Sequence, residues 1–108
     1  MNQLIKDIEL WASARGIIRE SDPKSQMLKT MEEVGELADA IGKDDYNALI
    51  DAIGDIAVTL IIQAKLNGAD FEECVNAAFI EISQREGQMV NGMYVKNQSS
   101  RNVRSESS

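Results

Sequence analysis

Two groups of acidic residues are the part of this chain whose types and spacing could do chemistry. The first group is Glu32, Glu33 and Glu36, and the second is Asp51 and Asp55. Residues three or four apart project from one side of a helix, so each group would present its carboxylates together. Carboxylate oxygens are the ligands of hard divalent ions such as Mg²⁺ and Mn²⁺. The pattern therefore predicts a metal site with oxygen ligands alone. A metal held in this way commonly acts on phosphates.

The elements that must position these acids all have the pattern of helices. Apolar residues recur at helical spacing in four segments, and start or stop signals flank them. Asp22 and Pro23 fit the first positions of a helix, and Gly42 fits a C-terminal cap. The predicted helices cover residues 2–15, 23–41, 45–67 and 71–86. The second of them has one apolar stripe, expected to be its core face, formed by Met27, Met31, Val34, Ala38 and Ile41.

The two acidic groups are predicted to lie side by side. A short loop, residues 42–44, joins the two middle helices, which makes them antiparallel neighbours. The groups stand at similar distances on either side of that loop, so they fall at the same height. A Glu-Glu-x-x-Glu pattern alone is usually a solvated helix face. Asp55 is harder to explain in that way, because it is the one charged residue between positions 52 and 64.

The chain as a whole is expected to form one all-α domain of the four-helix bundle type. Asn91-Gly92, between apolar and β-branched residues, predicts a short C-terminal hairpin or turn. Residues 97–108 are polar and poor in apolar side chains, so they are expected to be a disordered tail. The predicted domain therefore covers residues 1–96.

The amino-acid composition excludes several classes of function. The 108 residues hold 18 acids and 11 bases, a net charge of −7 with no basic stripe, so nucleic acid is not an expected partner. The absence of histidine excludes catalysis by a Ser-His-Asp triad or a Cys-His pair. Cys74, the single cysteine, cannot form an intrachain disulfide and is expected to pack inertly on the apolar side of a helix. No apolar run is long enough for a signal peptide or a membrane span, so the expected location is the cytoplasm.

Two stretches together resemble a known family. Lys29-Thr-Met-Glu-Glu-Val-Gly-Glu-Leu-Ala-Asp-Ala-Ile, followed by Asp51-Ala-Ile-Gly-Asp-Ile-Ala-Val-Thr-Leu, is similar to the MazG-like nucleoside triphosphate pyrophosphohydrolases of the all-α NTP pyrophosphatase superfamily. The likeness covers about residues 20–96, and its last part resembles the closing segment of small bacterial or phage members. It implies Mg²⁺-dependent hydrolysis of (deoxy)nucleoside triphosphates to monophosphate and pyrophosphate, with Mn²⁺ as a substitute. It also implies a homodimer or homotetramer that completes its sites across subunits.

The resemblance assigns roles to the acidic residues. Glu32 matches an extra glutamate that binds a further ion or orients the attacking water, and Glu33 is counted with it as catalytic. The second motif of the family is usually E-x-x-D, but the position three before Asp55 is Ala52. Asp51, spaced i, i+4 from Asp55, is expected to substitute for the missing glutamate. The residues matched to metal ligands in the family are Glu33, Glu36 and Asp55, and Asp51 is added to them.

Five further residues are candidates for binding the substrate. Lys29, Arg85 and Lys96 are cations for the phosphates, with solvation as the alternative for the two lysines. Family members often have a lysine four residues before the arginine matched by Arg85, where this chain has a glutamate. Asn76 either bonds the substrate or faces solvent. Trp11 either stacks on a base or packs in the core or at a subunit interface.

Two other functions stay open at this stage. The first is a non-enzymatic acidic helical protein that binds a partner or mimics nucleic acid, whose acids would be spread over exposed surface. The second is a degenerate member of the family that binds nucleotides without cleaving them, and the alanine at position 52 keeps that reading open.

Overall fold

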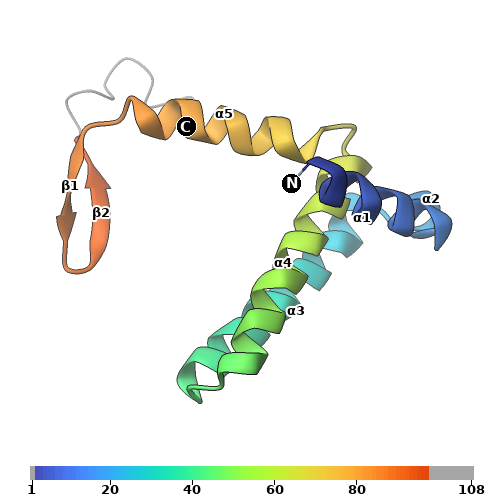
Figure 1. Cartoon of the computed structure of the whole chain (residues 1–108), viewed down its shortest axis with the longest axis horizontal. Helices are drawn as coiled ribbons and strands as arrows, with labels where there is room; N and C mark the ends of the chain where they lie inside the picture. The colour runs from blue at the N-terminus through green and yellow to red at the C-terminus, as the bar shows by residue number, and fades with distance from the viewer. Residues whose placement is uncertain (1, 98–108) are drawn as a thin grey trace. The chain divides into compact units, whose positions relative to one another are not determined.

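The computed structural model describes residues 2–97, which form five helices and one hairpin (Figure 1). The all-helical prediction with a short C-terminal hairpin is therefore confirmed. The predicted disordered tail lies, except for Asn97, outside the described residues. The elements are α1 (Asn2–Ala14), α2 (Ile17–Glu20), α3 (Pro23–Gly42), α4 (Tyr46–Leu66), α5 (Phe71–Ser83), β1 (Gly87–Val90) and β2 (Met93–Lys96).

The short helix α2 was not predicted. Gly16 has a left-handed backbone with φ of 79°, which ends α1 at low cost because glycine has no Cβ. The chain then re-enters a single helical turn in which Ile17 and Ile18 are half-buried. One turn is too short to produce a periodic signal, so the sequence pattern could not identify it.

Local side-chain bonds begin both long helices. The Asp22 carboxylate accepts a hydrogen bond from the Ser25 amide at 2.8 Å, ahead of the predicted proline at the first helical position. The Asp45 carboxylate accepts one from the amide of Ala48 at 3.1 Å at the start of α4. The prediction that Gly42 caps α3 is wrong, because α3 continues through it. The left-handed residue of this loop is Asp44, with φ of 55°.

Contacts divide the chain into two units, residues 1–74 and 75–108. In the first unit, α3 and α4 lie side by side over most of their length (Figure 1). The N-terminal helices α1 and α2 pack on α4 and on each other. The buried apolar residues of this unit are Ile5, Ala12, Ala40, Ala52, Ile61, Ile62 and Ala64.

The predicted core face of α3 is wrong. Met27 and Met31 are 47% and 59% exposed, and the rest of that stripe is exposed as well. The face of α3 that is buried is rotated by about one residue and is largely polar: Gln26, Thr30, Glu33 and Ala40. The helical period identified the apolar stripe of α3 but not the face that contacts α4. That face is polar because hydrogen bonds between polar residues hold α3 against α4.

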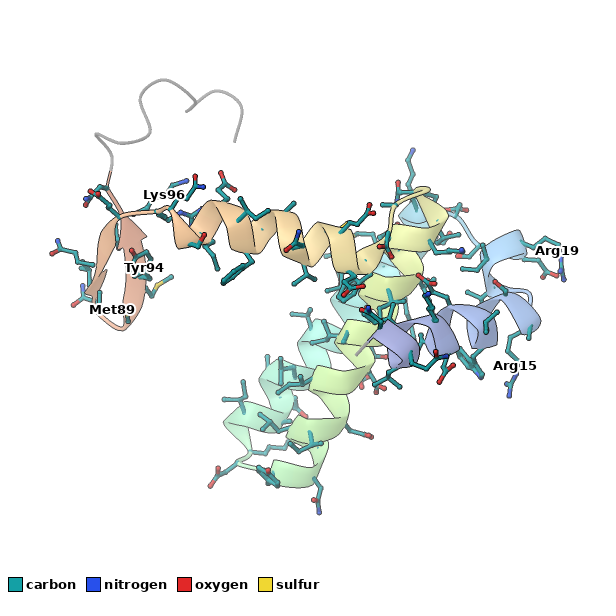
Figure 2. All side chains as sticks on the ribbon, turned by 45° about the horizontal axis from the view of Figure 1, so that its top comes forward. Arg15, Arg19, Met89, Tyr94 and Lys96 are labelled. Atoms are coloured by element: carbon teal, nitrogen blue, oxygen red, sulfur yellow. The ribbon has the colours of Figure 1, made fainter. Side chains whose placement is uncertain are left out.

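The second unit contains most of α5 and the hairpin. No residue of α5 is buried, and the expected packing of Cys74 is wrong, since the thiol is exposed. The strands pair antiparallel with Gly87 opposite Lys96. Asn91 and Gly92 both have positive φ, 51° and 81°, as a two-residue type I′ turn requires. Figure 2 shows Met89 and Tyr94, which are cross-strand partners, on the two strands of this hairpin.

No helix within residues 2–97 is long and apolar enough to cross a membrane.

Candidate active site

A set of hydrogen bonds between α3 and α4 fixes the relative height of the two helices. The Thr30 hydroxyl donates to the Thr59 hydroxyl at 3.0 Å, and the Gln26 amide nitrogen donates to the carbonyl of Thr59 at 3.1 Å. Glu33 follows Thr30 by one turn, and Asp55 precedes Thr59 by one turn. Because the helices are antiparallel, this register places Glu33 and Asp55 at the same level.

The two acidic groups border one groove beside the contact between α3 and α4. Its volume is about 540 Å³. The glutamates of α3 that line it are Glu32 and Glu36, and the aspartates of α4 are Asp51 and Asp55. Toward the loop the groove continues past Gly35, Asp39, Ala40, Lys43, Asp45, Ala48 and Ala52. The structure thus brings four of the five predicted carboxylates to the wall of one groove.

A second cavity, of about 430 Å³, adjoins these carboxylates on the side of α1 and α2. Asp55 lines both hollows, so it stands where they meet. Trp11, 44% exposed, lies in the wall of this cavity, and its ring is 5.4 Å from the guanidinium of Arg15. Figure 2 shows Arg15 near the end of α1. The other lining residues are Ile17, Gln26, Lys29, Glu33, Val58, Thr59 and Ile62.

Glu33 is the acid whose environment the sequence did not predict. It was expected on the side of α3 away from the core, but the residue is only 6% exposed. Its Oε2 atom lies 3.4 Å from Lys29 Nζ, and its buried Oε1 atom has no hydrogen-bond partner. A buried carboxylate oxygen without a partner is costly, and a divalent cation would satisfy it. This orphaned oxygen is the feature that fits a metal at the carboxylates.

The carboxylates act on one another electrostatically. The pKa of Asp55 is raised, mainly because the groove partly shields this exposed carboxylate from water, and then by the negative charges of Glu33 and Asp51. The pKa of Glu36 is raised, mainly by the charge of Glu33, then by partial loss of water and by the charge of Glu32. All five acids therefore belong to one cluster whose charges disfavour one another, and a cation would reverse the sign of that energy.

The carboxylates do not converge in this arrangement. Within residues 2–97, no three acidic or thiol side chains stand close enough together to hold an ion. Like charges at helical i, i+3 and i, i+4 spacing repel, and the acids that line the groove are exposed, so their side chains can turn outward. Convergence on a metal stays a prediction.

Three predicted substrate-binding residues belong to the second unit. Asn76 is exposed on α5, and Arg85 is half-buried between α5 and β1. Lys96 ends β2, also half-buried (Figure 2). Their role stays a prediction, because the carboxylates belong to the first unit.

These observations define the class of the protein: it is helical, and carboxylates line a groove along a pair of antiparallel helices. The chain belongs to the family of the MazG nucleotide pyrophosphohydrolase domain, whose family model matches residues 21–90. The resemblance expected from the two acidic stretches is therefore confirmed.

One relative is an uncharacterized 18.2 kDa protein from the rep-hol intergenic region of Haemophilus phage HP1. The two sequences are 43% identical over 70 residues, which is 65% of this chain and 43% of the relative. The chain thus matches less than half the length of that protein. No solved structure matches the chain.

Proposed function

We propose that this chain hydrolyses (deoxy)nucleoside triphosphates to the monophosphate and pyrophosphate, with Mg²⁺ as cofactor and Mn²⁺ as a substitute. Membership of the MazG family supports the reaction class. The observation that carries the proposal is the buried Glu33, whose Oε1 atom is without a partner beside Asp55. A solvated helix face would leave this oxygen in water.

The metal would be held by Glu33, Glu36 and Asp55, with Asp51 as a further ligand. These donors are all carboxylate oxygens, which suit Mg²⁺ and Mn²⁺ better than softer metals. When bound, the ion would neutralise charge on the phosphates and lower the pKa of a coordinated water molecule.

The remaining residues would position the substrate and the water. Glu32 lines the groove with an exposed carboxylate, which supports a role for it in orienting a water molecule. The water oxygen would bond to the α-phosphorus as the bond from that phosphorus to the α–β bridging oxygen breaks. Pyrophosphate would leave with the bridging oxygen, and the proton of the water would pass to solvent. Lys29, which pairs with Glu32 and Glu33, would contact the phosphates. The cavity that contains Trp11 would accept the base, with the indole ring as a stacking surface.

A second candidate function is nucleotide binding without cleavage. The family's usual glutamate is replaced by Ala52, which is 3% exposed and lines the groove. Asp51 stands one position earlier, with a shorter side chain than glutamate. If Asp51 does not complete the coordination, the chain would bind metal and nucleotide but release no pyrophosphate.

A homodimer or homotetramer is the proposed assembly. The predicted apolar stripe of α3 is exposed, and so are Ile53 and Leu60 of α4. Apolar faces of this extent on a small domain are commonly covered by another subunit. Light scattering coupled to gel filtration would test this proposal: a mass near 11.9 kDa, that of one chain, at micromolar protein would contradict it.

The activity is tested by incubating the purified full chain with standard and modified (d)NTPs in Mg²⁺ or in EDTA, and measuring pyrophosphate. Pyrophosphate formed only with Mg²⁺ supports the hydrolase. Nucleotide binding without product supports the second candidate, and release of phosphate alone means that a different bond is cut.

Matched variants connect the activity to the groove. Glu36→Gln and Asp55→Asn are expected to abolish turnover while circular dichroism shows unchanged helix content. Asp39→Asn is the control, since Asp39 lines the same groove but is not among the residues matched to metal ligands or catalytic residues. Wild-type turnover in either test variant would overturn the site.

A further inference from the structure

Within residues 2–97, Lys29 is the lysine with ion pairs to the acidic residues of the proposed site, and it makes two such contacts. Lys29 Nζ lies 3.1 Å from Glu32 Oε1 and 3.4 Å from Glu33 Oε2. The Glu32 side chain is 60% exposed, whereas that of Glu33 is only 8% exposed. Lys29 therefore bridges a solvated carboxylate and a buried one.

The contact with Glu33 is too weak to compensate for its burial. Charge-assisted hydrogen bonds between nitrogen and oxygen are typically about 2.7–2.9 Å long, and this contact is longer. It also engages only one oxygen, because Oε1 has no partner. The lysine thus supplies a positive charge near Glu33 without satisfying the carboxylate.

The other ion pairs in the described part of the chain do not involve a buried acid. Lys43 bonds Asp39 at 3.1 Å, and Arg19 bonds Glu20 at 3.0 Å, with both partners of each pair largely exposed. Within residues 2–97, the pair between Lys29 and Glu33 therefore differs from these two pairs, because it joins an exposed lysine to a carboxylate that is buried where α3 and α4 meet.

We propose that Lys29 is the resident counter-ion of Glu33 in the metal-free protein, and that a divalent metal displaces it. This inference rests on the proposed function, because it requires a metal at these carboxylates. The metal takes over the neutralisation of Glu33, and the ammonium group, on its flexible four-carbon stem, is released toward the adjoining cavity. Lys29 then becomes available to an anion such as pyrophosphate, so metal binding precedes and promotes phosphate binding.

The test compares Lys29→Met with Lys43→Met. The methionine retains most of the stem but removes the charge. Lys43 serves as the matched control because its ion pair with Asp39 lines the groove that Glu32, Glu36, Asp51 and Asp55 also line. Binding of Mg²⁺ alone is measured by isothermal titration calorimetry, and melting temperatures are measured in EDTA and in saturating Mg²⁺. Binding of pyrophosphate is then measured with and without Mg²⁺.

Displacement predicts three results for Lys29→Met. Mg²⁺ binds about two- to fivefold more tightly, as expected for removal of a competing surface-accessible charge. The melting temperature falls in EDTA but not in saturating Mg²⁺. Pyrophosphate binds more weakly than to the wild type when Mg²⁺ is present. Lys43→Met is expected to change Mg²⁺ affinity by less than Lys29→Met.

The possible results distinguish an error in the displacement of Lys29 from an error in the proposed function. Unchanged or weaker Mg²⁺ binding by Lys29→Met, or an equal gain in both variants, would overturn displacement while leaving the proposed function intact. A loss of melting temperature of equal size with and without Mg²⁺ would make Lys29 a structural residue. A folded wild-type protein that binds no Mg²⁺ would overturn the proposed function, and this inference with it.

Discussion

Replacing Glu33 with glutamine should make the metal-free protein more stable and the Mg²⁺-bound protein less so. Glutamine has the shape of glutamate without its charge. In EDTA the change removes a buried carboxylate with one unpartnered oxygen, a group whose burial costs about 1–3 kcal/mol. It also removes an ion pair with the half-exposed Lys29, which contributes about 0–1 kcal/mol.

The expected net change is a gain of about 1 kcal/mol in the free energy of unfolding, since the buried amide is itself imperfectly satisfied. For a domain of 60–100 residues, this corresponds to a rise of about 4–8 °C in melting temperature. In Mg²⁺ at 100 times its Kd, the wild type gains about 2.7 kcal/mol from binding. The variant lacks a ligand and loses most of this gain, so the order of the two melting temperatures reverses.

Differential scanning calorimetry in EDTA and in Mg²⁺ measures both effects. Glu32→Gln is the matched control: it removes the shorter contact with Lys29 from an exposed position, and its effect in EDTA should be small. A marked loss of stability in EDTA for Glu33→Gln, larger than that of Glu32→Gln, would mean that the buried carboxylate stabilises the metal-free fold. Glu33 would then be a structural group and not a metal ligand.

Three further predictions follow from the structure. Asp55→Asn should leave the melting temperature in EDTA unchanged or raised, because it removes a charge that Glu33 and Asp51 disfavour; a clear fall by calorimetry would give Asp55 a structural role. The metal-free protein should melt at higher temperature as pH is lowered from neutrality toward the ordinary pKa range of carboxyl groups. The folded-state pKa values of Glu36 and Asp55 are raised, so the native state binds protons more readily than the unfolded chain there, and a fall in melting temperature over that range would contradict this. Gly87→Ala should disrupt the hairpin, because a Cβ at this position would collide with the backbone of β2, whereas Gln88→Ala should not; amide hydrogen exchange would distinguish them, and equal protection in both would contradict the collision.

Local chemistry made much of the fold predictable. Asp22 and Pro23 mark the start of α3, and Asn91 and Gly92 mark the turn of the hairpin, through bonds and dihedral angles that involve only neighbouring residues. The groove was predictable for a related reason. A short loop makes α3 and α4 antiparallel, so acids at similar distances from it line the same hollow.

The side on which α3 meets α4 was not predictable in this way. The Met27 and Met31 stripe is the more apolar face, but Thr30 and Gln26 hydrogen-bond to Thr59, and these bonds turn the polar side of α3 inward. The burial of Glu33 follows from the same rotation. A signal was present in the sequence, since Gln26, Thr30 and Glu33 share one helix face, yet polar residues at helical spacing usually indicate a solvated side.

The most direct test of the metal site is a crystal structure of the full chain soaked in Mn²⁺, with an anomalous difference map. We predict a peak at roughly 2.1 Å from carboxylate oxygens of Glu33, Glu36 and Asp55. A map in which Mn²⁺ lies elsewhere, or in which these carboxylates stay apart at saturating Mn²⁺, would contradict it.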